Sequence, residues 1–335
     1  MTRLRRTASA RHARIRGTAA ARQARIAVSS PSFARNAALR QELLAKYPHV
    51  TFTESISVPD GEELVTLLRG HDRAIVGLER IDDGVLAQLP ELRVISKYGV
   101  GLDGLDVAAI ARRGIRLGWT GGVNRRSVAE LTLAFAIALL HRVPECDVAL
   151  RQGQWQKLVG RQLTGKIIGI IGCGAVGQEL VRLLAPFECR VLANDIRDYP
   201  EFYAAHRVTA VDLDALLGAA DIVTLHVPLD ASTRRMIGAA QLARMRPGAC
   251  LINAARGGLI DEEALADALE GGRLAGAAFD VFAMEPDANP RLVALPTFLG
   301  TPHIGGSTHE AQLAMGRAAI EGLETARVPG DGWPC

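Results

Sequence analysis

The chain has 335 residues, of which 48% are hydrophobic and 22% charged, so it is long enough for two domains of ordinary globular composition. No apolar run reaches the ~18 residues of a membrane span, and the five scattered cysteines, without a CxxC pair, argue against a disulfide framework or a zinc site and fit a reducing, cytoplasmic compartment. The net charge of +3 arises in residues 1–25, which hold eight arginines and no acid, whereas the remainder has 31 basic and 36 acidic residues. The basic balance is therefore poor evidence for nucleic-acid binding, and we expect neither nucleic acid nor membrane as a partner.

Residues 1–23 form a basic tail without the apolar h-region of a secretory signal. Three interpretations stay open for it. An Arg- and Ser-rich segment without acids is compatible with a transit peptide, with a disordered extension, or with a start codon assigned too early.

The first predicted elements alternate between strands and helices. Strands are predicted at 24–30, 72–78, 92–99 and 114–120, and helical segments at 35–46 and 82–89. The strands are apolar and β-branched. Such alternation predicts a parallel sheet with crossover connections.

A long helix is predicted at 124–143, apolar on most faces and therefore buried. From Ile167 a second series of strands follows, at 167–171, 189–195, 220–228, 249–255 and 275–282, each separated by a helix-compatible segment. The pattern predicts two doubly wound α/β domains, the larger beginning near residue 121.

The stretch "IIGIIGCGAVGQEL" contains Gly172-x-Gly174-x-x-Gly177 between a predicted strand and a predicted helix. In this context Gly172 permits a tight turn, Gly174 lets a diphosphate approach the backbone, and Gly177 lets the helix pack close to the strand. Asp195 ends the next strand and can accept hydrogen bonds from ribose hydroxyls, while it would repel a 2′-phosphate. The pattern therefore predicts NAD rather than NADP, a preference that nearby Arg197 weakens.

Three further segments carry acid–base and anion-binding side chains after short apolar strands: Arg256 in "INAARGG", Asp280 and Glu285 in "AAFDVFAMEP", and His303 in "TPHIGG". The carboxyl ends of parallel strands form the ligand crevice of such a sheet. A histidine can move a proton near neutral pH, a carboxylate can fix its tautomer, and an arginine can hold a carboxylate. We expect Gly257 and Gly258 to leave room for cofactor and substrate.

These motifs, with "KYGVGLDGLD" and "HVPL", resemble the D-isomer-specific 2-hydroxyacid dehydrogenase family, most closely its phosphoglycerate dehydrogenase-like branch. The resemblance covers roughly residues 72–325. It implies a Rossmann-type cofactor domain (121–302) inserted into a smaller flavodoxin-like substrate domain (24–120 plus 303–326), and dimerisation through the cofactor domain.

The resemblance also implies the site residues. The catalytic set would be Arg256, Glu285 and His303. Cofactor contacts would come from Gly172, Gly174, Ala175, Val176, Gly177, Asp195, His226, Val227, Pro228, Thr233, Ala254, Asp280 and Gly305. Substrate contacts would come from Lys97, Tyr98, Gly99, Val100, Gly101, Asn124 and Arg126, and no metal is expected.

Two alternatives to a hydroxyacid dehydrogenase stay open: the same chemistry on a substrate such as a phosphonate, and an NAD(H)-sensing binding protein like the corepressors that share this fold. Within the leading hypothesis, Lys97 and the pair Arg125–Arg126 suggest a substrate with a second anionic group, such as phosphate, unless these cations are solvated or pair with acids elsewhere. The short segment after the C-terminal helix predicts no regulatory domain and no serine feedback through one.

Overall fold

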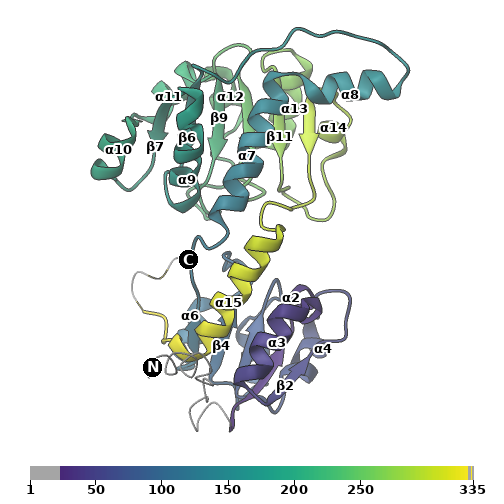
Figure 1. Ribbon diagram of the computed structural model, residues 1–335, viewed down its shortest axis with the longest axis vertical. Coiled ribbons are helices and arrows are strands. Elements are labelled where there is room, and N and C mark those ends of the chain that lie inside the picture. The colour runs from purple at the N-terminus through teal and green to yellow at the C-terminus, as the bar shows by residue number, and fades with distance from the viewer. Residues whose placement is uncertain (1–22, 331–332, 334–335) are drawn as a thin grey trace, which may run out of the picture. The chain divides into compact units, whose positions relative to one another are not determined.

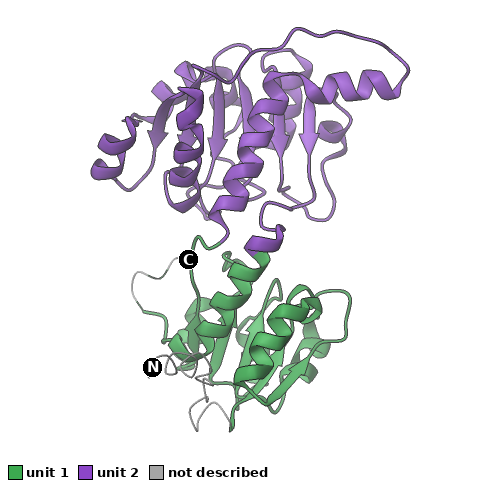
Figure 2. Cartoon of the chain, in the orientation of Figure 1, with its two compact units in different colours: residues 1–123, 312–335 green, residues 124–311 purple. Residues whose placement is uncertain are grey.

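The structure is a computed structural model that describes residues 23–330 and 333, so the basic tail up to residue 22 lies outside the described residues. The chain forms two compact units (Figure 2): unit 1 is residues 1–123 and 312–335, and unit 2 is residues 124–311. The sequence predicts the crossings at 120/121 and 302/303. The second crossing lies nine residues later because the backbone up to Gly305 is hydrogen-bonded to Asp280 and Ser127 of unit 2.

Unit 1 contains a five-stranded parallel sheet in the order β2-β1-β3-β4-β5. Its strands are β1 (Arg25–Val28), β2 (His49–Phe52), β3 (Arg73–Val76), β4 (Val94–Lys97) and β5 (Arg116–Gly118). Its helices are α2 (Pro31–Arg35), α3 (Ala37–Lys46), α4 (Gly61–Leu68), α5 (Asp83–Ala87), α6 (Val107–Arg112) and most of α15 (His309–Thr325). This strand order is the flavodoxin-like one.

Both faces of the unit 1 sheet are buried, which explains the continuous apolar strands. Ala27 and Ile95 pack on one side in a cluster with Leu64 of α4, and Ile26 packs on the other with Leu39 of α3. Helix α15 returns onto this second face (Figure 1), where the Ser96 hydroxyl donates to the Ala319 carbonyl at 2.6 Å.

Unit 2 contains a seven-stranded parallel sheet in the order β12-β11-β10-β9-β6-β7-β8. Its strands are β6 (Ile167–Ile171), β7 (Arg190–Asn194), β8 (Thr209–Ala210), β9 (Ile222–Leu225), β10 (Cys250–Asn253), β11 (Gly276–Phe279) and β12 (Phe298–Gly300). Its helices are α7 (Arg125–Leu140), α8 (Val143–Arg151), α9 (Ala175–Leu184), the 3₁₀ turn η1 (Ala185–Phe187), α10 (Pro200–His206), α11 (Leu213–Ala219), α12 (Ala239–Arg244), α13 (Glu262–Glu270) and α14 (Pro290–Val293). The order is that of a Rossmann domain, extended by one strand, with its switch point between β6 and β9.

The predicted fold class, two doubly wound parallel-sheet domains, is confirmed. The apolar helix predicted at 124–143 is α7, which packs on α9 and over β10 and β11 (Figure 1). Two strands were not predicted: β2 and the two-residue β8. Within the described residues no helix is long and apolar enough to cross a membrane.

Candidate active site

The predicted glycine loop connects β6 to α9 at the switch point of unit 2. Gly172 has φ +91°, and a Cβ there would lie 2.8 Å from the backbone of His226, so only glycine fits. A Cβ at Gly177 would lie 2.5 Å from the Gly172 carbonyl oxygen, which shows how closely α9 approaches the strand. Gly174, by contrast, faces open space and is the N-cap of α9 without a side-chain cap. The loop therefore offers an open approach to the backbone at a helix N-terminus, which suits a diphosphate.

Asp195 follows β7 and lies against the glycine loop. Its Oδ2 accepts the Cys173 backbone N–H at 2.6 Å, and its Oδ1 accepts the Arg197 backbone N–H at 2.8 Å. The aspartate thus ties the end of β7 to the loop and places a carboxylate beside it. Together with the open Gly174 cradle, this arrangement fits the adenosine side of NAD. Groups of acidic, histidine or cysteine side chains suited to a metal are absent from the described residues.

His226 follows β9 on the other side of the switch point. Its backbone N–H donates to the Ile171 carbonyl at 2.7 Å, and its Nε2 lies 3.1 Å from the Thr224 hydroxyl. Burial lowers the pKa of His226 to about 4, and its enclosed Nδ1 has no hydrogen-bond partner in the described part of the chain. The imidazole is therefore neutral at physiological pH, next to the glycine turn.

Arg256 lies in a short turn after β10 that is shaped by buried Asn253. The Asn253 side-chain amide donates to the Arg256 carbonyl at 2.8 Å, and its oxygen accepts the Ala255 N–H at 3.1 Å. The Arg256 side chain is half-buried, and its Nη1 donates to the Ala255 carbonyl at 2.7 Å. The turn thus holds the guanidinium at the carboxyl edge of the sheet.

The role expected for Gly257 needs correction. A Cβ at Gly257 would lie only 1.8 Å from the carbonyl oxygen of Phe282, so this glycine lets two protein loops touch and does not leave room for ligands. Gly258 has φ +81°, which explains it as a backbone requirement. The loop that carries Arg256 therefore packs directly on the loop that leads to Glu285.

Asp280 follows β11 and is 1% exposed. Its Oδ1 accepts the Thr301 hydroxyl at 2.6 Å and the Ile304 N–H at 2.7 Å, while its Oδ2 accepts the Gly305 N–H at 2.7 Å. The Asp280 carbonyl also accepts the His303 N–H at 2.8 Å. This aspartate therefore anchors the whole loop on which His303 stands.

His303 and Glu285 form the predicted pair. The Nδ1 of His303 lies 2.9 Å from Oε2 of Glu285, whose other oxygen accepts the Phe282 N–H at 3.1 Å. His303 has φ +54°, a left-handed conformation that is uncommon for a residue with a side chain and often found at functional sites. Side-chain exposures of 47% and 40% leave the pair open to a ligand. An accessible imidazole held by a carboxylate is a candidate acid–base group.

The cations at the start of α7 have partners within unit 2. Arg126 pairs with Glu130 at 2.6 Å and with Glu179 of α9 at 3.0 Å, and Arg125 lies 3.8 Å from Glu179. The hydrogen bond from Arg126 lowers the pKa of Glu179. The anion that compensates these arginines is thus a protein carboxylate, so the structure does not support the expectation that Arg126 awaits a substrate phosphate. Asn124, also predicted to bind substrate, is buried at the N-cap of α7.

The other predicted substrate contacts belong to unit 1, in the segment that begins at the end of β4. Lys97 is only 5% exposed, and its ammonium donates to the Gly77 carbonyl. Tyr98 is buried edge-on against Phe33 at 5.5 Å. Gly99 has φ +120°, and the Val100 carbonyl accepts the Trp119 indole N–H at 2.9 Å. The loop is thus built into the unit, with Lys97 pointing inward.

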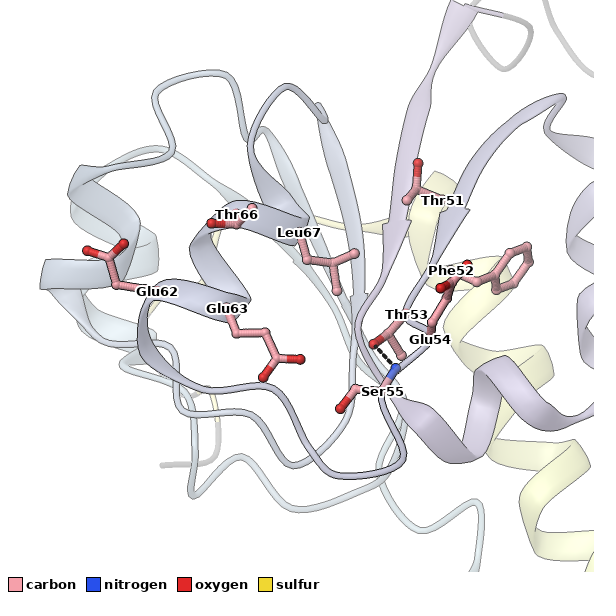
Figure 3. Close-up of a pocket in the computed structure, with 9 residues that line it drawn as sticks. All are labelled: Thr51, Phe52, Thr53, Glu54, Ser55, Glu62, Glu63, Thr66 and Leu67. Carbon is pink, nitrogen blue, oxygen red and sulfur yellow. Dashed lines mark hydrogen bonds between the residues drawn. The ribbon is translucent and has the colours of Figure 1, made fainter.

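A cavity of about 540 Å³ in unit 1 lies away from these residues (Figure 3). It is lined by Thr51, Phe52, Thr53, Glu54, Ser55, Glu62, Glu63, Thr66 and Leu67, from the end of β2 and from α4. With three carboxylates and no cation among these residues, it does not suit an anionic acid. We do not assign it to the site.

Sequence reasoning missed three polar side chains that shape the site: Asn253, which holds the arginine turn, Thr301, which binds Asp280, and Glu79, which is 1% exposed near Lys97. An asparagine at the end of an apolar strand was a signal for the first, since asparagine side chains commonly bond to nearby backbone. The other two had no such local signal, because their partners lie far away along the chain.

The chain is similar to known proteins over most of its length. The family model for the D-isomer specific 2-hydroxyacid dehydrogenase NAD-binding domain matches residues 133–305. A D-3-phosphoglycerate dehydrogenase of Mycobacterium tuberculosis is 36% identical over 271 residues, covering 80% of this chain and 51% of that protein. A glyoxylate reductase of Thermofilum pendens is 38% identical over 274 residues, covering 79% and 81%.

Among solved structures, a glyoxylate reductase from Paecilomyes thermophila has a TM-score of 0.81 at 26% identity and covers 92% of this chain and 99% of its own. The chain spans about half the length of the phosphoglycerate dehydrogenases it matches. The chain therefore belongs to the D-isomer specific 2-hydroxyacid dehydrogenase family, with NAD as the cofactor of its nucleotide-binding domain.

Proposed function

We propose that this chain is an NAD-dependent dehydrogenase that interconverts a small D-2-hydroxy acid and the corresponding 2-oxo acid. The observation that carries the proposal is the hydrogen bond between His303 and Glu285 at the same sheet edge as the glycine loop. When bound, NAD supplies the hydride acceptor for C2 of the hydroxy acid. The remaining chemistry, moving one proton and holding one carboxylate, falls to the protein.

In the proposed mechanism Glu285 holds the Nδ1–H of His303, which leaves Nε2 to take the hydroxyl proton during oxidation and to return it to the carbonyl oxygen during reduction. Arg256 would bind the substrate carboxylate and polarise the adjacent C–O bond. The backbone N–H groups of residues 97–101 in unit 1 are likewise proposed to bind a substrate carboxylate, as glycine-rich turns commonly do.

The cofactor contacts in this proposal come from the glycine loop, Asp195, the segment 226–228, and the neighbouring sheet-edge residues Thr233, Ala254, Asp280 and Gly305. Asp195 is proposed to bind the adenosine ribose and thereby to select NAD. Asp280 already accepts three hydrogen bonds from the His303 loop, and its carboxylate has about four acceptor sites. It is proposed to accept a further hydrogen bond from the nicotinamide amide.

For the substrate class we propose an unphosphorylated acid. The sequence suggests three cations for a second anion. Lys97 is bonded to the Gly77 carbonyl, and Arg125 and Arg126 pair with protein carboxylates. A 3-phosphoglycerate-like substrate is the second candidate, favoured by the 36–37% identity to phosphoglycerate dehydrogenases.

The test is a panel of 2-oxo acids, with glyoxylate, hydroxypyruvate and 3-phosphohydroxypyruvate included, assayed for oxidation of NADH. We expect turnover of at least one acid, and a loss of about 10²–10⁴-fold in kcat for His303→Ala with unchanged NADH affinity. The exposed His206 of α10 provides the matched control, His206→Ala, which should keep full activity. NADH binding without turnover of any acid would overturn the proposal and favour a nucleotide-sensing role.

We further propose that the chain forms a homodimer through α8 and the segment after it. Apolar side chains are unusually exposed there: Leu150 by 58%, Trp155 by 81% and Val159 by 90%. Several exposed apolar side chains within one segment commonly mark an interface. Light scattering should give twice the chain mass, and Trp155→Glu should weaken the association. A monomer at micromolar concentration would contradict this assignment.

A further inference from the structure

Unit 1 holds a buried acid and a buried base that both bond to Gly77, and the base begins the loop that the proposed function assigns to the substrate carboxylate. Glu79 is 1% exposed and follows β3, and Lys97 is 5% exposed and ends β4. We propose that Glu79 and Lys97 are positioning residues: through their bonds to Gly77 and their mutual attraction, they fix the 97–101 loop for binding the substrate carboxylate through its backbone. This inference rests on the proposed function.

The two side chains meet at the peptide groups of Gly77. The Gly77 N–H donates to Oε2 of Glu79, and the Gly77 carbonyl accepts the Lys97 ammonium. The ammonium also lies 3.5 Å from the Tyr98 carbonyl oxygen and 3.5 Å from the position a Cβ would take at Gly99. Lys97 thus connects the turn after β3 to the first residues of its own loop.

The packing around Gly77 leaves little freedom to this arrangement. A Cβ at Gly77 would lie 2.8 Å from the Ser30 hydroxyl, and one at Gly104 would lie 2.7 Å from the Glu79 carbonyl oxygen. The segments after β1, β3 and β4 are therefore in close contact at the carboxyl edge of the sheet. Because these segments are closely packed, a change in Glu79 or Lys97 is expected to shift the backbone of the loop.

Electrostatics explains why both residues are needed. An isolated buried charge is costly, and removing one partner of a buried pair leaves the other uncompensated. Burial raises the pKa of Glu79, while bonds from backbone N–H groups and from Ser29, and the charge of Lys97, oppose that rise. Its Oε1 has no hydrogen-bond partner among the described residues, and the charge of Lys97 adds to the compensation that the backbone N–H groups and Ser29 give this carboxylate.

The same geometry changes the role expected for Lys97 from the sequence. An ammonium that is 5% exposed and bonded to the Gly77 carbonyl is not offered to a substrate phosphate. Its loss should therefore affect phosphorylated and unphosphorylated acids equally, since both present the same carboxylate to the loop.

The experiment is a double-mutant cycle on the full chain, with Glu79→Gln, Lys97→Met and the double variant, assayed for kcat, KM for the active 2-oxo acid, and NADH affinity. We expect each single variant to raise KM by about 10–100-fold, with kcat changed less and NADH affinity unchanged. The fold-increase in KM of the double variant should be at least about fivefold smaller than the product of the fold-increases of the two single variants. Lys97→Met should lower kcat/KM by the same factor for glycerate and for 3-phosphoglycerate.

The matched control is Ser96→Ala, the residue before Lys97, whose buried hydroxyl bonds to α15 instead of the loop. It should lower the melting temperature and leave KM alone. If Lys97→Met does not fold, Glu79→Gln carries the test, because it keeps the size of the side chain and removes only its charge, and its KM should still rise by about 10–100-fold. The proposal would be overturned if the fold-increases in KM of the two single variants simply multiplied in the double variant. It would also be overturned if Lys97→Met lowered kcat/KM only for the phosphorylated acid. Failure of the wild type on every acid would instead overturn the proposed function, and this role with it.

Discussion

Gly257→Ala is the substitution for which the structure makes the sharpest forecast. The added Cβ would lie 1.8 Å from the oxygen and 2.1 Å from the carbon of the Phe282 carbonyl, whereas real contacts of this kind stay above 3.0 Å. The loops must therefore separate by at least about 1.2 Å. The obstacle is backbone, which cannot turn aside as a side chain would, so we expect a cost near the upper end of the usual range for overpacking, about 3 kcal/mol.

The displacement should also reach the proposed acid–base pair. The Phe282 N–H holds Oε1 of Glu285 at 3.1 Å, and Oε2 of the same carboxylate lies 2.9 Å from His303. A shift of about 1 Å in catalytic groups can cost about 10²-fold in rate. We therefore expect Gly257→Ala to lower kcat by about that factor with an intact glycine loop and unchanged NADH affinity.

Thermal unfolding and steady-state kinetics measure both effects. For a unit of this size, about 3 kcal/mol corresponds to a fall of about 6–12 °C in Tm. The control is Gly218→Ala on α11, where a Cβ meets nothing within 4 Å, so stability should rise by about 0.5–1 kcal/mol and kcat should stay the same. A Gly257→Ala protein with the Tm and kcat of the wild type would refute the reasoning.

Three further predictions concern single residues. In fluorescence titrations, Asp195→Ala should weaken NADH binding by about 10–100-fold and reduce the difference in affinity between NADH and NADPH. A wild type that binds NADPH more tightly than NADH would contradict the assignment of Asp195 to the adenosine ribose. Burial lowers the pKa of His226 to about 4. Between pH 6.5 and 4 the unfolded chain therefore binds a proton that the folded chain excludes, so the contribution of His226 to the free energy of unfolding should decrease by up to about 3 kcal/mol as the pH is lowered. In urea titrations at pH 7 and 5, His226→Asn should show a weaker pH dependence than the wild type. An unaltered dependence in the variant would exclude the histidine as its source. Glu179→Gln removes the carboxylate shared by Arg125 and Arg126 at the start of α7, and should cost about 1 kcal/mol at low salt and less in 1 M NaCl; no salt dependence would count against the pairing.

Most of the fold was predictable because its signals are local. The strands of a parallel sheet covered on both faces are largely apolar, as in "IAV" of β1 and "IIGII" of β6, and the glycine loop has a fixed spacing. The missed strands β2 and β8 lie at sheet edges, where side chains stay partly exposed, so "HVTF" and "TA" lack an apolar run. The short helix α2 before the helix predicted at 35–46 was also missed, and the boundary between α2 and α3 depends on the single side chain of Asn36, which caps α3.

The site was predictable in its residue types and less so in its geometry. Asp280, Glu285 and His303 follow strands that the sequence places at one edge, but the left-handed backbone of His303 and the hydrogen bonds that anchor its loop arise only when β11 and β12 are adjacent. The role of Gly257 was wrong for a related reason. A sequence shows that a side chain is missing, and only the fold shows which neighbour occupies the space.

The cations show most clearly why charge roles escape sequence reasoning. Glu130 is one helical turn from Arg126 and could be foreseen as its partner, whereas Glu179 is 53 residues away and approaches only because α9 packs on α7. From the sequence alone Lys97 is predicted to face the substrate, whereas in the structure it is buried, as Glu79 is. The sequence assigned four cations to an anionic substrate: Lys97, Arg125, Arg126 and Arg256. The first three have partners within their own units, and Arg256 is carried by a turn at the sheet edge that also bears the His303–Glu285 pair. If Arg256 reads the carboxylate there, a substrate needs no second anion to be held, which is why an unphosphorylated acid is the simpler expectation.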